Sequence, residues 1–326
     1  MGRTGLEVSR LGLGLAALGR PAYINLEHGS DVGPDRSVEG MERRAHEVLD
    51  EAFDAGVRYF DIARSYGRAE AFVSSWLARR GPAPAAVTIG SKWGYTYVGE
   101  WAVDAEVHEV KDHSADTLRR QLDESRALLG PRLALYQIHS ATLDSGVLED
   151  RAVLQELVRL RAGGVVVGLT TSGPRQSETL WRALELALDG THPFTCVQAT
   201  WNLLEPSAEE ALAVAHERGW GVIVKEPVAN GRLSPRAAGT RDEAAGEILR
   251  SVCAKHGVTV DAVAIAGALH QPWADVVLSG AASGAQLQSN LTAFHVSLSE
   301  ADLDEMSAQA EPPEEYWSKR SALPWN

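Results

Sequence analysis

The amino-acid sequence predicts an α/β protein built as a (β/α)8 or TIM barrel, in which parallel strands close into a cylinder inside a ring of helices. Two observations predict this fold. Segments with a helical period alternate regularly with short β-branched or aromatic runs along most of the chain. There are eight strand-like runs, enough to close a parallel barrel. Because such a barrel needs about 250 residues, we expect residues 1–326 to form a single domain with added segments.

The predicted strands share a high content of Val, Ile, Leu and Tyr with few polar breaks, as buried parallel strands do. They span residues 11–15, 57–62, 87–91, 133–138, 165–170, 196–199, 221–224 and 276–278. The predicted helices span residues 44–55, 69–80, 114–129, 150–162, 176–188, 208–218 and 241–256. Gly56, Gly130 and Gly219 stand at the ends of three of these helices, as left-handed caps do.

Four stretches fall outside the repeat. Residues 2–10 predict a short β-hairpin ahead of the first strand. Residues 20–40 are rich in Gly, Pro and Asp and predict an insertion over a strand end, either a pocket wall or a mobile loop. Residues 94–112 predict a long loop with several aromatic residues. Beyond residue 299 we expect a C-terminal helix and a tail that lies on the barrel.

Composition narrows the partners. The formal net charge of −13, without a basic cluster, argues against nucleic acid and against anionic membrane surfaces. No apolar stretch approaches about 20 residues, and no secretory signal opens the sequence, so we expect no membrane span and a cytoplasmic location. The two cysteines fit a reducing compartment. His108 and His113 have the wrong spacing for a metal site on one helical face, and we expect no metal.

An acidic residue and a tyrosine follow the second predicted strand. Asp61 stands at the end of that strand, and Tyr66 lies on the turn that Gly67 closes. In parallel barrels, reactive groups gather at the carboxyl ends of strands and in the loops after them. The two side chains therefore either share a pocket, or Asp61 caps the turn while Tyr66 packs on the next helix.

Two more residues end strands on the same side of the barrel. Lys92 ends the third strand, where burying an ammonium is costly unless it is paired. Asp61 is the partner that we expect, and a cation held against Tyr66 would lower the pKa of that phenol from about 10. His139 ends the fourth strand, where a lone histidine is more often packed than functional.

Four pieces of the sequence, in order, resemble the aldo-keto reductases: residues 57–67, "SKWG" with Lys92, "LYQIHS" with His139, and "GAASGAQLQSN" near the end. The resemblance covers nearly the whole chain. It implies an oxidoreductase that transfers a hydride between a nicotinamide cofactor and the carbonyl or alcohol carbon of a small aldehyde, ketone or sugar. It also implies that Tyr66 is the general acid and base, that His139 orients the carbonyl, and that Lys92 and Asp61 support Tyr66.

The resemblance also implies where the cofactor binds. Trp201 would stack on the nicotinamide, and Gln198 and Thr171 would bind its carboxamide. The remaining predicted contacts are Pro227, Val228 and Gly231 for the pyrophosphate, and Gly280, Ser283, Gln286 and Asn290 for the adenosine. Family members often carry Lys or Arg in this last segment for the 2′-phosphate of NADPH, and residues 279–290 contain neither. The resemblance therefore implies NADP(H), with NAD(H) as the alternative unless Arg232 or another distant base reaches the phosphate.

Two other functions fit parts of the pattern. A non-catalytic nicotinamide-binding regulatory module of the same fold, similar to the potassium-channel β subunits, would keep the same four polar residues. An unrelated barrel lyase or isomerase would use Lys92 to form a Schiff base with its substrate. That reading gives no role to Trp201 or to the Gly- and Ser-containing segment near the end of the chain.

Overall fold

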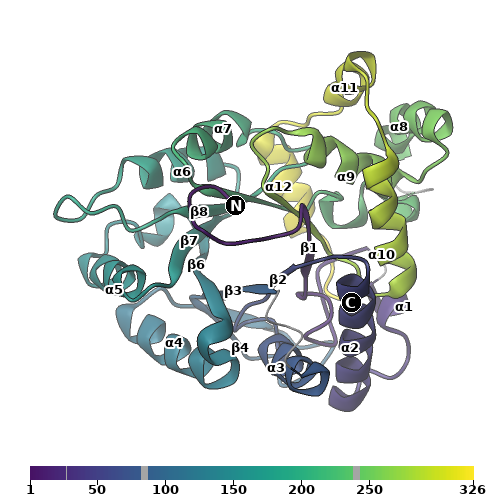
Figure 1. Ribbon diagram of the computed structural model, residues 1–326. Helices are drawn as coiled ribbons and strands as arrows, with labels where there is room; N and C mark the ends of the chain where they lie inside the picture. Colours follow the sequence, from purple (N-terminus) through teal and green to yellow (C-terminus); the bar gives the residue numbers. More distant parts are fainter. Residues whose placement is uncertain (27, 82–86, 238–242) are drawn as a thin grey trace.

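The computed structural model describes residues 1–26, 28–81, 87–237 and 243–326, without the side chains of residues 243–248. Its main strands are β1 (Leu11–Gly14), β2 (Tyr59–Asp61), β3 (Thr88–Trp93), β6 (Leu133–Ala141), β7 (Val166–Thr171), β8 (Cys196–Thr200), β9 (Gly221–Lys225) and β10 (Val276–Ser279). They form a closed parallel barrel in the order β1-β10-β9-β8-β7-β6-β3-β2 (Figure 1). The predicted barrel of eight strands is confirmed.

Helices surround the barrel (Figure 1). They are α2 (Val38–Asp54), α3 (Ala69–Arg80), α4 (Ala115–Leu129), α5 (Arg151–Ala162), α6 (Gln176–Glu185), α7 (Glu209–Glu217), α8 (Glu243–His256) and α10 (Gly284–Leu291). The helix α2 begins earlier than predicted because Ser37 caps it, with its side-chain oxygen accepting a hydrogen bond from Gly40 N at 3.1 Å. The predicted start of α8 at residue 241 lies outside the described residues.

Several elements were not expected from the sequence period. They are α1 (His28–Val32), the antiparallel pair β4 (Tyr95–Tyr97) and β5 (Glu109–Lys111), α9 (Val260–His270) and α12 (Pro313–Ser321), which follows the expected helix α11 (Glu300–Ser307). Most of α9 is buried. A helix that is apolar on all sides shows no helical period, which is why the sequence pattern missed it.

The β-hairpin expected over residues 2–10 is not formed, which corrects the prediction. The chain instead makes a turn in which Thr4 N donates to Met1 O at 3.3 Å and the Met1 amino group donates to Leu6 O at 3.2 Å. Met1, Leu6 and Val8 then pack on the apolar amino end of the barrel interior. Figure 1 shows this segment crossing the end of the barrel. Sealing the barrel with these side chains takes the place of strand pairing.

The interior of the barrel changes from apolar to polar along its axis. The apolar layer consists of Tyr59, Leu135, Cys196, Ile223, Val276 and Leu278. Further toward the carboxyl ends, the buried residues include Asp61, Lys92 and Gln198. Burying polar groups is costly unless they are hydrogen-bonded or paired, so this second layer indicates a functional site.

No single helix in the described ranges is long and apolar enough to cross a bilayer. Residues Leu249–His256 and α9 reach that length and composition only together, and they are bent by 93°.

Candidate active site

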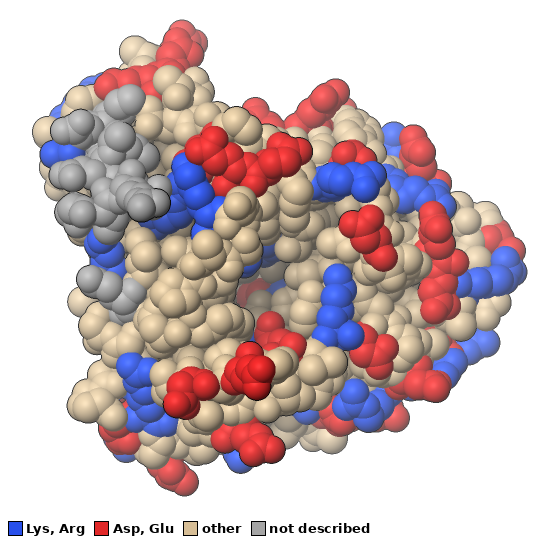
Figure 2. Space-filling view, turned by 180° about the vertical axis from the view of Figure 1, so that it is seen from behind, with Lys and Arg blue, Asp and Glu red and all other residues tan. Residues whose placement is uncertain are grey.

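A cavity of about 280 Å³ opens at the carboxyl ends of the strands. Figure 2 shows a hollow in the face opposite to the one seen in Figure 1, with acidic and basic side chains inside it. Polar side chains from six different strands line the cavity: Asp61, His139, Thr170, Gln198, Lys225 and Ser279. The fold therefore brings distant parts of the chain to one site, as parallel barrels do.

Asp61 and Lys92 form a buried ion pair beside the cavity, with side chains 3% and 1% exposed. The Lys92 ammonium contacts Asp61 Oδ1 and donates to the Ile62 carbonyl at 3.1 Å. The other carboxylate oxygen accepts hydrogen bonds from Gln198 Nε2 at 2.7 Å and from the Tyr59 hydroxyl at 3.2 Å. Burial lowers the pKa of Lys92, while the Asp61 carboxylate opposes that shift. The expected pairing is present, although Lys92 itself is not on the cavity wall.

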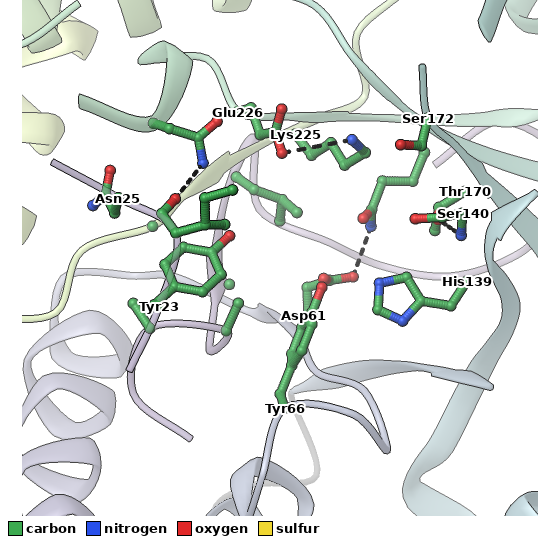
Figure 3. A pocket seen from close by; sticks show the side chains of 18 of the residues that line it. Tyr23, Asn25, Asp61, Tyr66, His139, Ser140, Thr170, Ser172, Lys225 and Glu226 are labelled. Atoms are coloured by element: carbon green, nitrogen blue, oxygen red, sulfur yellow. Dashed lines mark hydrogen bonds and ion pairs between the residues drawn. The ribbon is translucent and has the colours of Figure 1, made fainter. Parts of the chain in front are cut away.

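Tyr66 and His139 lie next to this pair on the cavity wall (Figure 3). Lys92 Nζ is 4.8 Å from the centroid of the Tyr66 ring. The His139 ring is edge-on to Tyr66, with 5.5 Å between centroids, and its Nδ1 is 3.3 Å from Ser65 Oγ. Burial, with the positive charges of Lys92 and Arg20, holds the pKa of His139 well below its usual value. The imidazole is therefore neutral at pH 7, and the four predicted catalytic residues lie together.

The expectation that Lys92 brings the pKa of Tyr66 below its ordinary value is wrong. Burial raises the pKa of Tyr66 well above its usual value, and the Asp61 carboxylate raises it further, while Arg20 opposes both. The physical reason is that burial disfavours the phenolate and that Lys92 is bonded directly to Asp61, whose carboxylate acts on the phenol in the opposite sense. Tyr66 therefore keeps its proton at neutral pH.

The alternation of side chains decides which hydroxyl groups at the end of β7 reach the cavity. Thr171, predicted to bind a carboxamide, does not line the cavity, and its Oγ1 donates to Gln176 Oε1 at 3.4 Å. Thr170 and Ser172 line the cavity instead, because successive side chains of a strand point to opposite faces. Thr170 Oγ1 also accepts a hydrogen bond from Ser140 N at 2.7 Å. The two neighbours of Thr171 thus replace it as candidate contacts.

Trp201 is also placed away from the cavity, which argues against the stacking role predicted for it. Its indole packs against Trp273, with 5.8 Å between ring centroids, and its Nε1 donates to Glu209 at 3.1 Å. Gln198 does line the cavity, but its Nε2 is bonded to Asp61. The aromatic side chains on the wall are Tyr23, Tyr66, Tyr95 and Trp325.

A second cavity of about 260 Å³ extends from the first toward the start of α10. The two cavities are adjacent and share Asn25, Val228 and Gly280 on their walls, and we refer to them together as the groove. Other residues predicted for the cofactor lie along it: Pro227 on the first cavity, and Gly231, Gln286 and Asn290 on the second. Ser283 is not on the wall, and it caps α10 by accepting a hydrogen bond from Gln286 N at 3.4 Å.

Two arginines follow the loop after β9. Arg232, which we considered as a distant base, is buried and forms an ion pair with Glu311 at 2.7 Å. Arg236 lines the second cavity and pairs with Asp31 of α1. Arg236 is therefore the better placed of the two to meet an anionic group in the groove.

Lys225 and Glu226 directly precede the loop predicted to bind the pyrophosphate, and both line the cavity (Figure 3). Burial lowers the pKa of Lys225 to about 8, although Glu226 opposes the shift. Burial disfavours the Glu226 carboxylate, but Arg320 and Lys225 hold its pKa at about 2. Arg320 of α12 donates from Nε to both Glu226 oxygens at 3.0 Å. This ion pair docks the C-terminal helix at the site.

The insertion over residues 20–40 and the C-terminal tail border the cavity on one side. Tyr23 N donates to Asn326 O at 3.2 Å, and Asn326 N donates to Tyr23 O at 3.3 Å. Trp325 stacks on His108 with 4.3 Å between ring centroids. From the insertion, Arg20, Tyr23, Ile24 and Asn25 line the cavity, so its first part forms a cavity wall.

The histidines of residues 108–113 have structural contacts. His113 Nε2 lies 2.8 Å from the His139 carbonyl oxygen, and His108 stacks on Trp325. Within the part of the chain that the structure describes, no group of three or more His, Cys, Asp or Glu side chains is placed to hold a metal ion.

Comparison with known proteins relates this geometry to a family. The model of the aldo/keto reductase family matches residues 10–311. Pyridoxal 4-dehydrogenase of Microbacterium luteolum is 26% identical over 360 aligned residues, which cover 98% of this chain and 94% of that protein. The NADH-specific methylglyoxal reductase of Escherichia coli strain K12 is 25% identical over 351 residues, which cover 95% of this chain and 97% of that protein.

A solved structure supports the fold. The holo form of the aldo-keto reductase AKR11C1 from Bacillus halodurans matches with a TM-score of 0.69 and 21% identity, covering 96% of this chain and 95% of that one. A likeness at this level of identity bears on the barrel architecture alone.

Proposed function

The chain belongs to the aldo/keto reductase family of oxidoreductases, and we propose that it transfers a hydride between a nicotinamide cofactor and the carbonyl or alcohol carbon of a small aldehyde, ketone or sugar. One observation carries the proposal. Tyr66 and His139 face one cavity beside the buried pair of Asp61 and Lys92. A proton donor, a neutral hydrogen-bond partner and a supporting cation are the groups that carbonyl reduction requires.

In this mechanism Tyr66 donates its hydroxyl proton to the carbonyl oxygen of the substrate. Its raised pKa keeps the phenol protonated and ready to donate. His139 is neutral, so one ring nitrogen can donate a hydrogen bond to the same oxygen and orient the carbonyl. A reduced nicotinamide, when bound, supplies the hydride that adds to the carbonyl carbon. The role of the ion pair is to hold Lys92 against the Tyr66 ring.

The two adjacent cavities that make up the groove would together suit an elongated, anionic dinucleotide. A Cβ built on Gly280, which lines both cavities, would meet no atom within 4 Å, so the wall leaves open space at this position. Lys225 stands in the catalytic cavity and Arg236 in the second, so each half of the groove offers a cation. Thr170, Ser172 and Gln198 would hold the nicotinamide carboxamide, and the start of α10 would receive the adenosine end.

The comparisons support the substrate class. The two relatives are named for pyridoxal and for methylglyoxal, which are both small carbonyl compounds. A cavity of about 280 Å³ is of a size that suits such molecules. One relative is named as NADH-specific, so NAD(H) as well as NADP(H) belongs in the proposal.

Tyr66→Phe tests the proposal. We expect it to reduce turnover by roughly 10²–10⁴-fold with little change in cofactor affinity, because the hydroxyl is needed only to move the proton. Oxidation of NADPH and NADH by the purified protein is measured with pyridoxal, methylglyoxal, aldoses and simple ketones. Tyr136→Phe is the matched control, since Tyr136 is a buried tyrosine that packs in the core outside the barrel. Cofactor binding without turnover of any carbonyl or alcohol would favour the regulatory module instead.

A further inference from the structure

Arg20 is an arginine buried at the catalytic cavity. Its side chain is 2% exposed, and it lies on the cavity wall. Three aromatic rings surround the guanidinium carbon, at 4.7 Å for Trp325, 5.3 Å for Tyr23 and 5.4 Å for Tyr66, measured to the ring centroids. A cation over an aromatic face is attracted by the ring quadrupole, most strongly where water is excluded. Arg20 is therefore held against the proposed proton donor.

Two hydrogen bonds fix the position of Arg20. One guanidinium nitrogen donates to the Ser65 carbonyl at 3.0 Å and to Glu109 Oε1 at 2.6 Å. Ser65 directly precedes Tyr66 in the chain, so the first contact also sets the loop that carries the phenol. Glu109 is on the strand β5, and its side chain is 18% exposed, so its charge is better solvated than that of Arg20.

Two cations lie against the Tyr66 ring. Lys92 Nζ is 4.8 Å from the Tyr66 ring centroid, but it contacts the Asp61 carboxylate directly. Arg20 is 5.4 Å from the same centroid, and its counter-ion is the partly solvated Glu109. The other charged or titratable groups that face Tyr66 from neighbouring elements are His139, Glu226, Tyr23 and Tyr59. Arg20 is thus placed to offset the negative charge of Asp61 at the phenol.

We propose that Arg20 is a positioning residue for proton transfer: its guanidinium stabilises the negative charge that develops on Tyr66 when the phenol gives its proton to the substrate. This inference rests on the proposed function. In the reducing direction the carbonyl carbon gains a hydride and its two electrons from the reduced nicotinamide, which is oxidised. The electron pair of the C=O π bond forms the new O–H bond with the Tyr66 proton, and the pair of the broken O–H bond remains on Tyr66 as phenolate.

The electrostatics of the site agree with this role. Burial is the largest cause that raises the pKa of Tyr66, followed by the Asp61 carboxylate, and Glu109 and Glu226 also raise it. Arg20 is the cation that acts against them. Removing Arg20 should make Tyr66 a weaker acid, and removing the charge of Glu109 should make it a stronger one.

The Arg20–Glu109 ion pair allows a test by the sign of the effect. Arg20→Gln should lower kcat/KM for carbonyl reduction by roughly 10–100-fold, because the developing phenolate loses its cation. Glu109→Gln breaks the same ion pair from the other side and should raise kcat/KM by about two- to fivefold. Arg20→Lys keeps the charge and should recover most of the loss. In alcohol oxidation, which starts from the phenolate, Glu109→Gln should shift the pH–rate profile to lower pH.

A purely structural role for the pair would give a different result. Both neutral variants would then lose activity together, the double variant would be no worse than either, and the pH–rate profile would not move. That outcome would overturn the inference. Circular dichroism and thermal unfolding establish that each variant folds. If Arg20→Gln does not fold, the two single variants Arg20→Lys and Glu109→Gln provide the test. If the parent protein turns over no carbonyl or alcohol, the proposed function fails rather than the role of Arg20 within it.

Discussion

Breaking the ion pair of Lys92 and Asp61 from one side should be strongly destabilising, because both side chains are almost completely buried. In Lys92→Met the Asp61 carboxylate keeps only neutral donors, Gln198 Nε2 at 2.7 Å and the Tyr59 hydroxyl at 3.2 Å. An uncompensated buried charge of this kind costs about 3–5 kcal/mol. At about 2 °C per kcal/mol for a large domain, the midpoint of thermal unfolding should fall by at least about 6 °C.

Asp61→Asn should be milder, since burial already lowers the pKa of Lys92 and its ammonium can lose the proton. Lys92→Met combined with Asp61→Asn removes both charges, so the double variant should be more stable than Lys92→Met alone. Urea unfolding of the parent, both single variants and the double variant gives the coupling free energy, which we expect to exceed about 2 kcal/mol. Arg151→Gln is the control, because its ion pair with Asp189 is exposed on both sides and should contribute less than about 0.5 kcal/mol.

The same four proteins test whether the pair acts as one unit in catalysis. Both single variants change the charge that is held against the Tyr66 ring, so the double variant should lose little more kcat/KM than the worse single variant. Stability losses and kinetic losses that simply add in the double variant would show that the two residues act separately, and would refute the reasoning for both.

Three other predictions concern the rest of the groove. Cofactor affinity should weaken as the pH rises through about 8, where Lys225 loses its charge, and titrations by tryptophan fluorescence should show no such weakening in Lys225→Met. In the folded protein the pKa of Glu226 is about 2, which is below the ordinary pKa of a glutamate. Its ion pair with Arg320 therefore stabilises the fold fully at pH values above the ordinary pKa, and this stabilisation is lost as the pH falls toward 2. In Arg320→Gln the free energy of unfolding should consequently change less with pH over that window. The protein should bind both cofactors with at most a modest preference for NADP(H). Gln286→Arg should improve NADP(H) binding selectively, and Arg236→Gln should weaken NADP(H) binding by about tenfold. A preference of the parent protein for NADP(H) above about a thousandfold would contradict the prediction.

The strands, and the meeting of the four predicted catalytic residues at one site, were predictable because both depend on local patterns. Each strand is a short buried run, and a parallel barrel puts every strand end on one face. That rule alone brings Asp61 and His139 to one cavity with Tyr66, which lies in the loop after Asp61, and places Lys92 beside the cavity in its ion pair with Asp61. Their common position therefore follows from the alternation of helices and strands.

The errors along the groove came from side-chain direction. A shift of one residue along a strand turns a side chain to the opposite face. Of the predicted cofactor contacts, Thr171 points away from the cavity, which Thr170 and Ser172 line, and Trp201 packs against Trp273. Successive side chains of a strand point to opposite faces, and Gln198 lines the cavity. Trp201, three residues later, is therefore expected to point away from the cavity.

Contacts between distant segments were beyond any local pattern. Arg20 lies 4.7 Å from the ring of Trp325, which is about 300 positions away in the chain. Arg320 likewise meets Glu226 across the cavity wall. The composition of the insertion and of the tail does not predict these contacts, because they depend on how the two segments fold over the end of the barrel.

The protonation state of the cavity bears on the direction of the reaction. If Tyr66 is the proton donor, carbonyl reduction starts from the phenol and alcohol oxidation starts from the phenolate. The raised pKa of Tyr66 and the lowered pKa of His139 leave both groups neutral at pH 7, which is the state that reduction uses. Oxidation then depends on the small phenolate fraction, which grows about tenfold with each pH unit below the pKa. The proposed role of Arg20 would consequently matter most where that fraction is limiting, and alcohol oxidation should rise with pH over a range in which reduction is nearly constant.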